Sequence, residues 1–232
     1  MAKKKQADQG DKSLGNIESA LSRTELYIEN NQKMLTNILA GILAVVLLII
    51  AGNRYILKPR SQEAATNMYM AEKYFELDSF NLALNGYGTY PGFLDIIDEY
   101  SFTKSANLAK YYAGICFNEI GEYDEAIKYL NKYRSRDMLI SAATLSAIGD
   151  AYSELGQYNK AIKSYLASAN KHENQFSSPI VLKKAGIIYE KTGAFEDALE
   201  IYERIEKEYP ASSESNDMKK YIGRVKARLS SL

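Results

Sequence analysis

Residues 149–165 read GDAYSELGQYNKAIKSY, and the same pattern occurs twice more in the chain. Residues 114–130 read GICFNEIGEYDEAIKYL, and residues 186–202 read GIIYEKTGAFEDALEIY. In each copy a glycine is followed by an aromatic residue after three positions, a second glycine after seven, an alanine after twelve and a large residue after sixteen. The alanines lie 35 and 37 residues apart. This period indicates pairs of helices that stack into a solenoid.

Each position of the pattern has a physical reason. The first glycine lets the second helix of a pair approach the first one closely, because it has no side chain to separate them. The second glycine falls where the first helix must end, and the left-handed residue that follows a helix is most easily a glycine. A single pair leaves an apolar face exposed, so the pairs must stack on one another. The sequence therefore predicts an all-α fold.

These residues resemble the tetratricopeptide repeat (TPR) family, and the resemblance covers about residues 107–210. Pro210, directly after Tyr209, stands where such a repeat usually closes. The resemblance implies an α-solenoid of about four helix pairs within residues 61–232, followed by a C-terminal capping helix. The expected segments are a weak repeat at 64–88, repeats at 107–140, 142–175 and 179–210, and the capping helix at 212–230.

The weak repeat departs from the pattern in two ways. Asp78 stands where a glycine is expected, and an insertion over residues 86–100 follows, although Tyr87 still occupies the position of the last large residue. Three glycines and a proline within residues 86–92 cannot continue a helix, whereas residues 93–100 have the apolar spacing of a short one. Insertions in repeat arrays often lie on the binding face. This insertion is therefore either a binding arm or a packing element that closes the stack.

Residues 34–53 contain no charged side chain. About 20 apolar residues in a helix span a hydrocarbon core of about 30 Å, and basic residues follow from Arg54 onward. A stacked repeat array has no place for a helix that is apolar on all sides, which argues against a buried core helix. The long preceding segment argues against a cleavable signal peptide. We predict a transmembrane signal anchor at residues 34–57.

Two segments precede the predicted span. Residues 1–13 are polar and basic, and we expect a disordered tail. Residues 14–33 have the spacing of an amphipathic helix, which either lies on a membrane or partner surface or simply leads into the span. Basic residues on the two sides of the span do not fix its orientation, but long C-terminal domains translocate largely regardless of charge. We therefore place the N-terminus in the cytoplasm and the repeats outside.

The sequence offers no grouping of side chains for catalysis. His172 is the single histidine and lies in a polar connection, while Cys116, the single cysteine, lies inside a repeat helix. Carboxylate pairs at the starts of second helices complement the helix dipole, and the glycines are periodic rather than clustered into a phosphate loop. Equal numbers of basic and acidic residues give no case for nucleic-acid binding. We predict a protein that is not an enzyme and has no cofactor, metal or small-molecule substrate.

The remaining candidate site is the concave groove that the first helices of a TPR array form. By the family's geometry, its residues here are Tyr111, Ile115, Asn118, Ser146, Asp150, Ser153, Lys183, Ile187 and Glu190. This mixture of polar and apolar side chains suits an extended peptide or a partner helix. It lacks the clustered Lys, Arg and Asn of TPR domains that hold a C-terminal carboxylate. The alternative is a groove that is filled by the protein's own segments.

The whole layout is similar to that of the YfgM-like bacterial membrane proteins. This resemblance implies a single-pass protein of the bacterial inner membrane with a periplasmic TPR domain. It also implies partners among SecYEG translocon subunits, exported polypeptides and periplasmic chaperones, and hence an adaptor or chaperone-like holdase. One alternative is a scaffold for another cell-envelope complex. An enzyme or ligand sensor is a third hypothesis, against which the lack of a convergent polar cluster argues.

Overall fold

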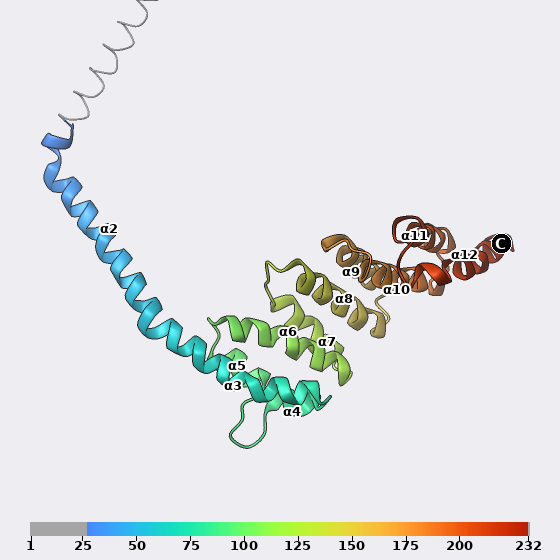
Figure 1. The fold of residues 1–232 in the computed structure, drawn as a ribbon, viewed down its shortest axis with the longest axis horizontal. Coiled ribbons are helices and arrows are strands. Elements are labelled where there is room, and N and C mark those ends of the chain that lie inside the picture. The colour runs from blue at the N-terminus through green and yellow to red at the C-terminus, as the bar shows by residue number, and fades with distance from the viewer. Residues whose placement is uncertain (1–26, 232) are drawn as a thin grey trace, which may run out of the picture. The chain divides into compact units, whose positions relative to one another are not determined.

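The computed structural model describes residues 27–231 and divides the chain into two units, residues 1–58 and 59–232 (Figure 1). The first unit contains α2 (Gln32–Gly52) and a π-helical turn, η1 (Asn53–Leu57). The predicted tail at 1–13 and most of the predicted helix at 14–33 lie outside the described residues. Within the described range, one helix is long and apolar enough to cross a membrane, and none of its apolar window is buried.

The second unit is a series of helices that pack in chain order (Figure 1). These are α3 (Lys58–Glu76), α4 (Phe80–Asn85), α5 (Phe93–Glu99), α6 (Lys104–Glu119), α7 (Tyr123–Lys132), α8 (Met138–Glu154), α9 (Tyr158–Lys171), α10 (Ser178–Lys191), α11 (Phe195–Glu208) and α12 (Ser215–Leu229). Helices α6 with α7, α8 with α9, and α10 with α11 form the pairs, and each pair contacts the next. The predicted all-α solenoid is confirmed.

The turns inside the pairs have one geometry. Gly121, Gly156 and Gly193 all have positive φ, at 84°, 69° and 80°. In the α8–α9 turn, the amide after the glycine donates to the carbonyl oxygen of Tyr152 at 2.8 Å, and the other two turns have the equivalent bond. Asp78 has φ 53°, and the amide after it donates to Tyr74 in the same way. The weak repeat therefore keeps the turn although it lacks the glycine.

The first glycine of each copy is the point of closest approach between the helices of a pair. A Cβ added at Gly149 would lie 2.6 Å from the ring of Tyr165, and one at Gly186 would lie 2.5 Å from the ring of Tyr202. In the α6–α7 pair, a Cβ at Gly114 would likewise overlap Leu130. The large residue sixteen positions on therefore rests on the bare backbone of the glycine.

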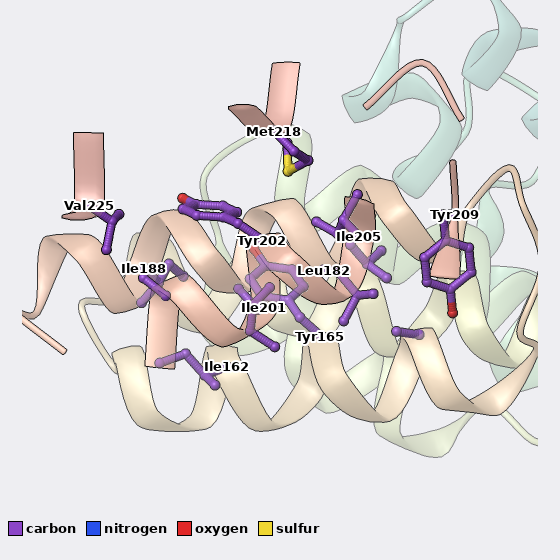
Figure 2. Packing of buried hydrophobic residues seen from close by; sticks show 14 of the residues in the cluster. Ile162, Tyr165, Leu182, Ile188, Ile201, Tyr202, Ile205, Tyr209, Met218 and Val225 are labelled. Atoms are coloured by element: carbon purple, nitrogen blue, oxygen red, sulfur yellow. The ribbon is translucent and has the colours of Figure 1, made fainter. Parts of the chain in front are cut away.

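The C-terminal half of the solenoid shares one apolar cluster (Figure 2). Tyr202, Leu182 and Ile205 are fully buried between α10, α11 and the neighbouring helices. Met218 and Val225 extend the cluster from α12 and are also fully buried. Because α12 adds its apolar side chains to this core, it closes the C-terminal end of the stack.

The insertion after the weak repeat has two parts. Helix α4 ends at Asn85, and the chain then forms a tight hairpin in which Tyr87 and Tyr90 exchange backbone hydrogen bonds. Tyr87 is 69% exposed, so it does not pack as the last large residue of the regular repeats does. In contrast, Phe93 and Ile96 of α5 are fully buried. Residues 93–99 thus pack in the core, whereas the hairpin is exposed.

Candidate binding groove

A pocket of about 320 Å³ lies along α8, between α6 and α10. Its lining is mainly apolar and comprises Ile115, Leu139, Ala142, Ala143, Ser146, Ala147, Asp150, Ser168, Ser177, Ile180 and Val181. A second pocket of about 230 Å³ lies toward the C-terminal ends of α6 and α8 and is lined by Ile115, Asn118, Glu119, Tyr123, Ala147, Asp150 and Glu154. The two pockets share three residues, so we treat them as one trough, called here the α8 groove.

Four of the residues predicted for the groove line it. Ser146 lines the first pocket, Asn118 lines the second, and Ile115 and Asp150 line both. The helix period explains this grouping, because residues three or four positions apart share one face of a helix. The same spacing continues toward the start of α8 through Ala143 and Leu139, which the sequence analysis missed.

Two other predicted residues do not line the α8 groove. The ring of Tyr111 is partly buried in an apolar cluster and lies 5.6 Å from that of Tyr133. Burial raises the pKa of the Tyr111 hydroxyl. Ser153 is partly buried and lines neither pocket. Tyr111 therefore contributes to the packing between helix pairs and does not line the α8 groove.

The C-terminal end of the predicted groove is engaged by α12. The Lys183 ammonium lies 5.4 Å from the centre of the Tyr221 ring, and Glu190 accepts hydrogen bonds from Arg224 at 2.6 and 2.9 Å. Ile187 stays 44% exposed. The protein's own capping helix thus occupies this end, and the open groove is shorter than the sequence pattern predicts.

Asp150 connects two adjacent helix pairs. Its carboxylate accepts a hydrogen bond from the Tyr165 hydroxyl at 2.7 Å and ion-pairs with the Lys184 ammonium at 2.7 Å. Burial and the adjacent carboxylate both raise the pKa of Tyr165. In the next pair, the Glu190 carboxylate accepts from Tyr202 at 2.6 Å and, as described above, from Arg224. These carboxylates hold the junctions of the array.

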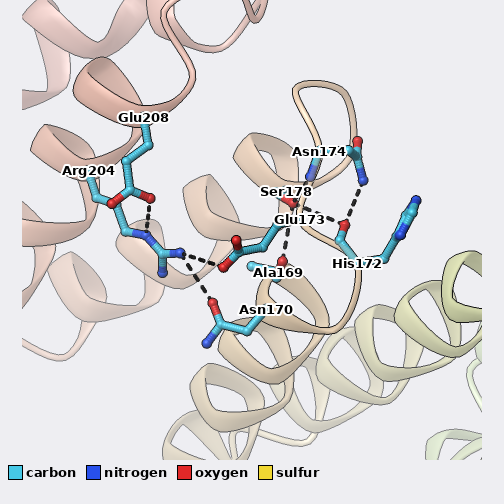
Figure 3. A network of polar contacts seen from close by, with 8 residues as sticks. All are labelled: Ala169, Asn170, His172, Glu173, Asn174, Ser178, Arg204 and Glu208. Atoms are coloured by element: carbon cyan, nitrogen blue, oxygen red, sulfur yellow. Dashed lines mark hydrogen bonds and ion pairs between the residues drawn. The ribbon is translucent and has the colours of Figure 1, made fainter.

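Neither of the two residues considered for chemistry lies in a reactive arrangement. Burial raises the pKa of the Cys116 thiol to about 12, so it stays protonated at neutral pH. His172 belongs to the connection before α10, where its carbonyl oxygen accepts a hydrogen bond from Asn174 at 2.7 Å (Figure 3). Within residues 27–231, no group of three His, Cys, Asp or Glu side chains could hold a metal ion.

Arg204 anchors the neighbouring connection to α11. Its guanidinium donates to Glu208 at 2.8 Å and to Asn170 at 3.2 Å, and lies 3.7 Å from Glu173 (Figure 3). Asn170 lies in the last turn of α9, so these contacts join successive helix pairs. The polar side chains of this network are therefore bonded to one another and stabilise the fold.

Comparison with known proteins agrees with this architecture. Two family models, both described as tetratricopeptide repeat, match residues 108–137 and 146–213. Two crystal structures of kinesin light chain-type TPR-like repeats from Podospora anserina are similar, at 12% identity with TM-scores of 0.55 and 0.53. The first covers 71% of this chain and 85% of its own.

A crystal structure of MamA is 16% identical, with a TM-score of 0.49, and covers 69% of this chain and 95% of its own. No curated protein matches the chain. The matched residues cover most of the helix pairs α6–α7 and α8–α9 and all of α10–α11. The chain therefore contains tetratricopeptide repeats over residues 108–137 and 146–213.

Proposed function

We propose that this protein is a membrane-anchored adaptor that holds an extended segment of a partner protein in the α8 groove. Tetratricopeptide repeats indicate a role in protein–protein interaction. The observation that carries the proposal is the open, mainly apolar trough across α6, α8 and α10, which keeps Leu139 and Ile180 exposed at 56% and 39%. Exposed apolar side chains that line a concave surface are typical of a binding site.

Helix α2 supports the anchoring part of this proposal. Its apolar side chains are exposed along its length, which is unfavourable in water and favourable in lipid. We propose that residues 34–57 span the bacterial inner membrane, with the N-terminus in the cytoplasm and the repeats in the periplasm. The proposed partners are subunits of the SecYEG translocon, exported polypeptides or periplasmic chaperones.

The test is photo-crosslinking in living cells from within the groove. A photoreactive amino acid replaces Ala143, which is exposed and lines the first pocket, and a matched control replaces Lys163 on α9, which is exposed outside it. We expect protein adducts from position 143 and few from position 163, with translocon subunits or exported chains identified by mass spectrometry. Adducts with other envelope proteins would instead favour a scaffold for a different envelope complex.

Topology is tested on the same cells. Protease added outside the inner membrane should digest the repeats if they are periplasmic. Cytoplasmic adducts together with a protected repeat domain would contradict both the orientation and the translocon association. Equal adducts from positions 143 and 163 would contradict the groove as the binding site.

A further inference from the structure

We propose that the α8 groove selects peptides in which a basic residue lies about four positions from a bulky apolar one. This inference rests on the proposed function, because it requires the groove to bind an extended peptide. It concerns the chemistry of that peptide, which the fold alone does not specify. Three features of the described residues carry it: an apolar half, an acidic half and two helix ends without cations.

The two halves of the groove differ in character. The half along the first part of α8 is lined by Leu139, Ala142, Ala143 and Ala147, with Ile180 opposite. Small alanines form the floor and the larger aliphatic side chains stay exposed. A floor of this kind leaves space for a large apolar side chain of a ligand, whose burial provides binding energy.

The other half carries two carboxylates. Glu119 ends α6 and Glu154 ends α8, both are exposed, and both line the second pocket. Neither carboxylate forms an ion pair with another residue in the described part of the chain. Asp150, the third carboxylate of this half, is already paired with Lys184.

The helix ends add to this negative charge. A helix C-terminus has a partial negative charge, and a basic residue in the last turn normally offsets it. Helices α7, α9, α10, α11 and α12 each have a Lys or Arg there, whereas α6 and α8 have none and end in glutamate instead. Helices α4 and α5 of the irregular first part also lack such a cation, but among α6–α12 the two helices without one are the two whose ends meet at the second pocket. Such departures are expected at functional sites.

The nearby groups form no ion pair with the two glutamates in the described part of the chain. The Lys191 ammonium lies 4.7 Å from the centre of the Tyr158 ring, and its pKa is raised mainly by the hydrogen bond to the Tyr158 hydroxyl and less by Glu154. Asn118 donates to the Ala147 carbonyl at 3.0 Å, and its Oδ1 is a buried oxygen with no donor among the described residues. A ligand ammonium or guanidinium would supply the positive charge that this half of the groove lacks.

The distance between the halves sets the spacing of the ligand. Glu154 and Ser146 are eight residues apart on α8, or about 12 Å at 1.5 Å per residue. An extended peptide advances by about 3.3 Å per residue, so roughly four residues bridge the two levels. The complementary peptide therefore has its basic and apolar residues about four positions apart.

The experiment measures peptide binding to the full chain in detergent micelles by fluorescence anisotropy. Three labelled ten-residue peptides share two leucines and differ in one residue four positions away, which is lysine, serine or glutamate. The protein variants are Glu119→Gln with Glu154→Gln, Ala143→Trp to fill the apolar half, and a control, Glu196→Gln with Glu200→Gln. The control removes two exposed carboxylates from α11, outside the groove lining.

We expect the lysine peptide to bind most tightly and the glutamate peptide most weakly. Glu119→Gln with Glu154→Gln should weaken the lysine peptide about tenfold and leave the serine peptide within twofold, while the control changes neither. Added salt should reduce the lysine preference. Ala143→Trp should weaken all three peptides.

Equal affinities for the three peptides would overturn the charge selection and leave the adaptor function intact, provided that Ala143→Trp still weakens them. A lysine preference that survives Glu119→Gln with Glu154→Gln would also overturn the inference, because the charge would then come from elsewhere. Failure of all three peptides to bind would overturn both the inference and the groove as a peptide site.

Discussion

The first helix pair and the regular pairs reach similar packing by different routes. In the α8–α9 and α10–α11 pairs, a glycine makes the turn and a tyrosine ring rests on a second glycine. In the first pair, Asp78 makes the turn, and the second helix is interrupted by the hairpin at residues 86–92. Helix α5 then supplies the buried residues that the short α4 cannot.

The difference shows which parts of the repeat are geometric requirements. All four turns have a residue with positive φ, whatever its side chain. In each of them the following amide donates a hydrogen bond to the carbonyl oxygen five residues earlier. The filling of the space between helices is more permissive: an aromatic cluster of Phe75, Phe93 and Tyr112 does in the first half what the tyrosine–carboxylate contacts do in the second. Four predictions test this comparison.

The largest effect is expected where the irregular pair depends on α5. Phe93 is fully buried and stacks on Tyr112 with ring centres 5.1 Å apart. Phe93→Ala should lower the free energy of unfolding by about 3–5 kcal/mol, as measured by urea denaturation. Phe102→Ala is the matched control, because that ring is 93% exposed. A loss for Phe93→Ala no larger than the control's would mean that α5 is not part of the core.

The regular pairs should be most sensitive at the glycine under the tyrosine ring. Gly149→Leu forces Tyr165 or the whole of α9 to move, and we expect a loss of about 1–3 kcal/mol, seen as a lower melting temperature. Gly223→Leu on α12 is the control, since an added Cβ there meets no atom within 4 Å. The control should be neutral or slightly stabilising because leucine favours helices. Equal behaviour of the two variants would refute the close approach.

Removing a tyrosine–carboxylate contact should lower the free energy of unfolding by less than either of these changes. Tyr165→Phe keeps the ring but removes the hydrogen bond to Asp150, at a cost of about 1 kcal/mol. The folded-state pKa of Tyr165 lies above its unfolded value, so the folded protein retains a proton that the unfolded chain loses. Stability should therefore fall as pH rises above about 10. Tyr165→Phe should make that fall shallower in denaturation measured from pH 8 to 11; an unchanged slope would contradict the shift.

The smallest effects should come from exchanging turn residues between the two regions. Asp78→Gly relieves a positive φ and should stabilise the protein by up to about 1 kcal/mol, whereas Gly156→Asp should destabilise it by a similar amount. An added Cβ at Gly156 would meet no atom within 4 Å, so its effect isolates the backbone. If Asp78→Gly raises the melting temperature and Gly156→Asp lowers it, the two turns are equivalent. Two changes of the same sign would show that Asp78 makes a specific contribution.

The fold could be predicted because its determinants are local and repeated. The glycines at 114, 149 and 186 and the turns four residues beyond each aromatic follow from helix geometry alone. Ile115, Ser146 and Asp150 could be placed in the groove for the same reason. The positions of Lys183 and Glu190 could not be predicted, because they depend on how α12 docks through Met218 and Val225. The exposure of Ala143 and Leu139 likewise depends on the spacing between helix pairs, which no single repeat encodes.

The charges on α10 have a consequence for how such a chain can change its length. Lys184 pairs backward with Asp150, and Glu190 pairs forward with Arg224, each across a separation of 34 residues. Helix α10 thus presents a cation to the preceding helix pair and an anion to the helix that follows its own pair. In an array lengthened by duplication of α10 and α11, we expect each new junction between pairs to contain Glu190 of one copy and Lys184 of the next.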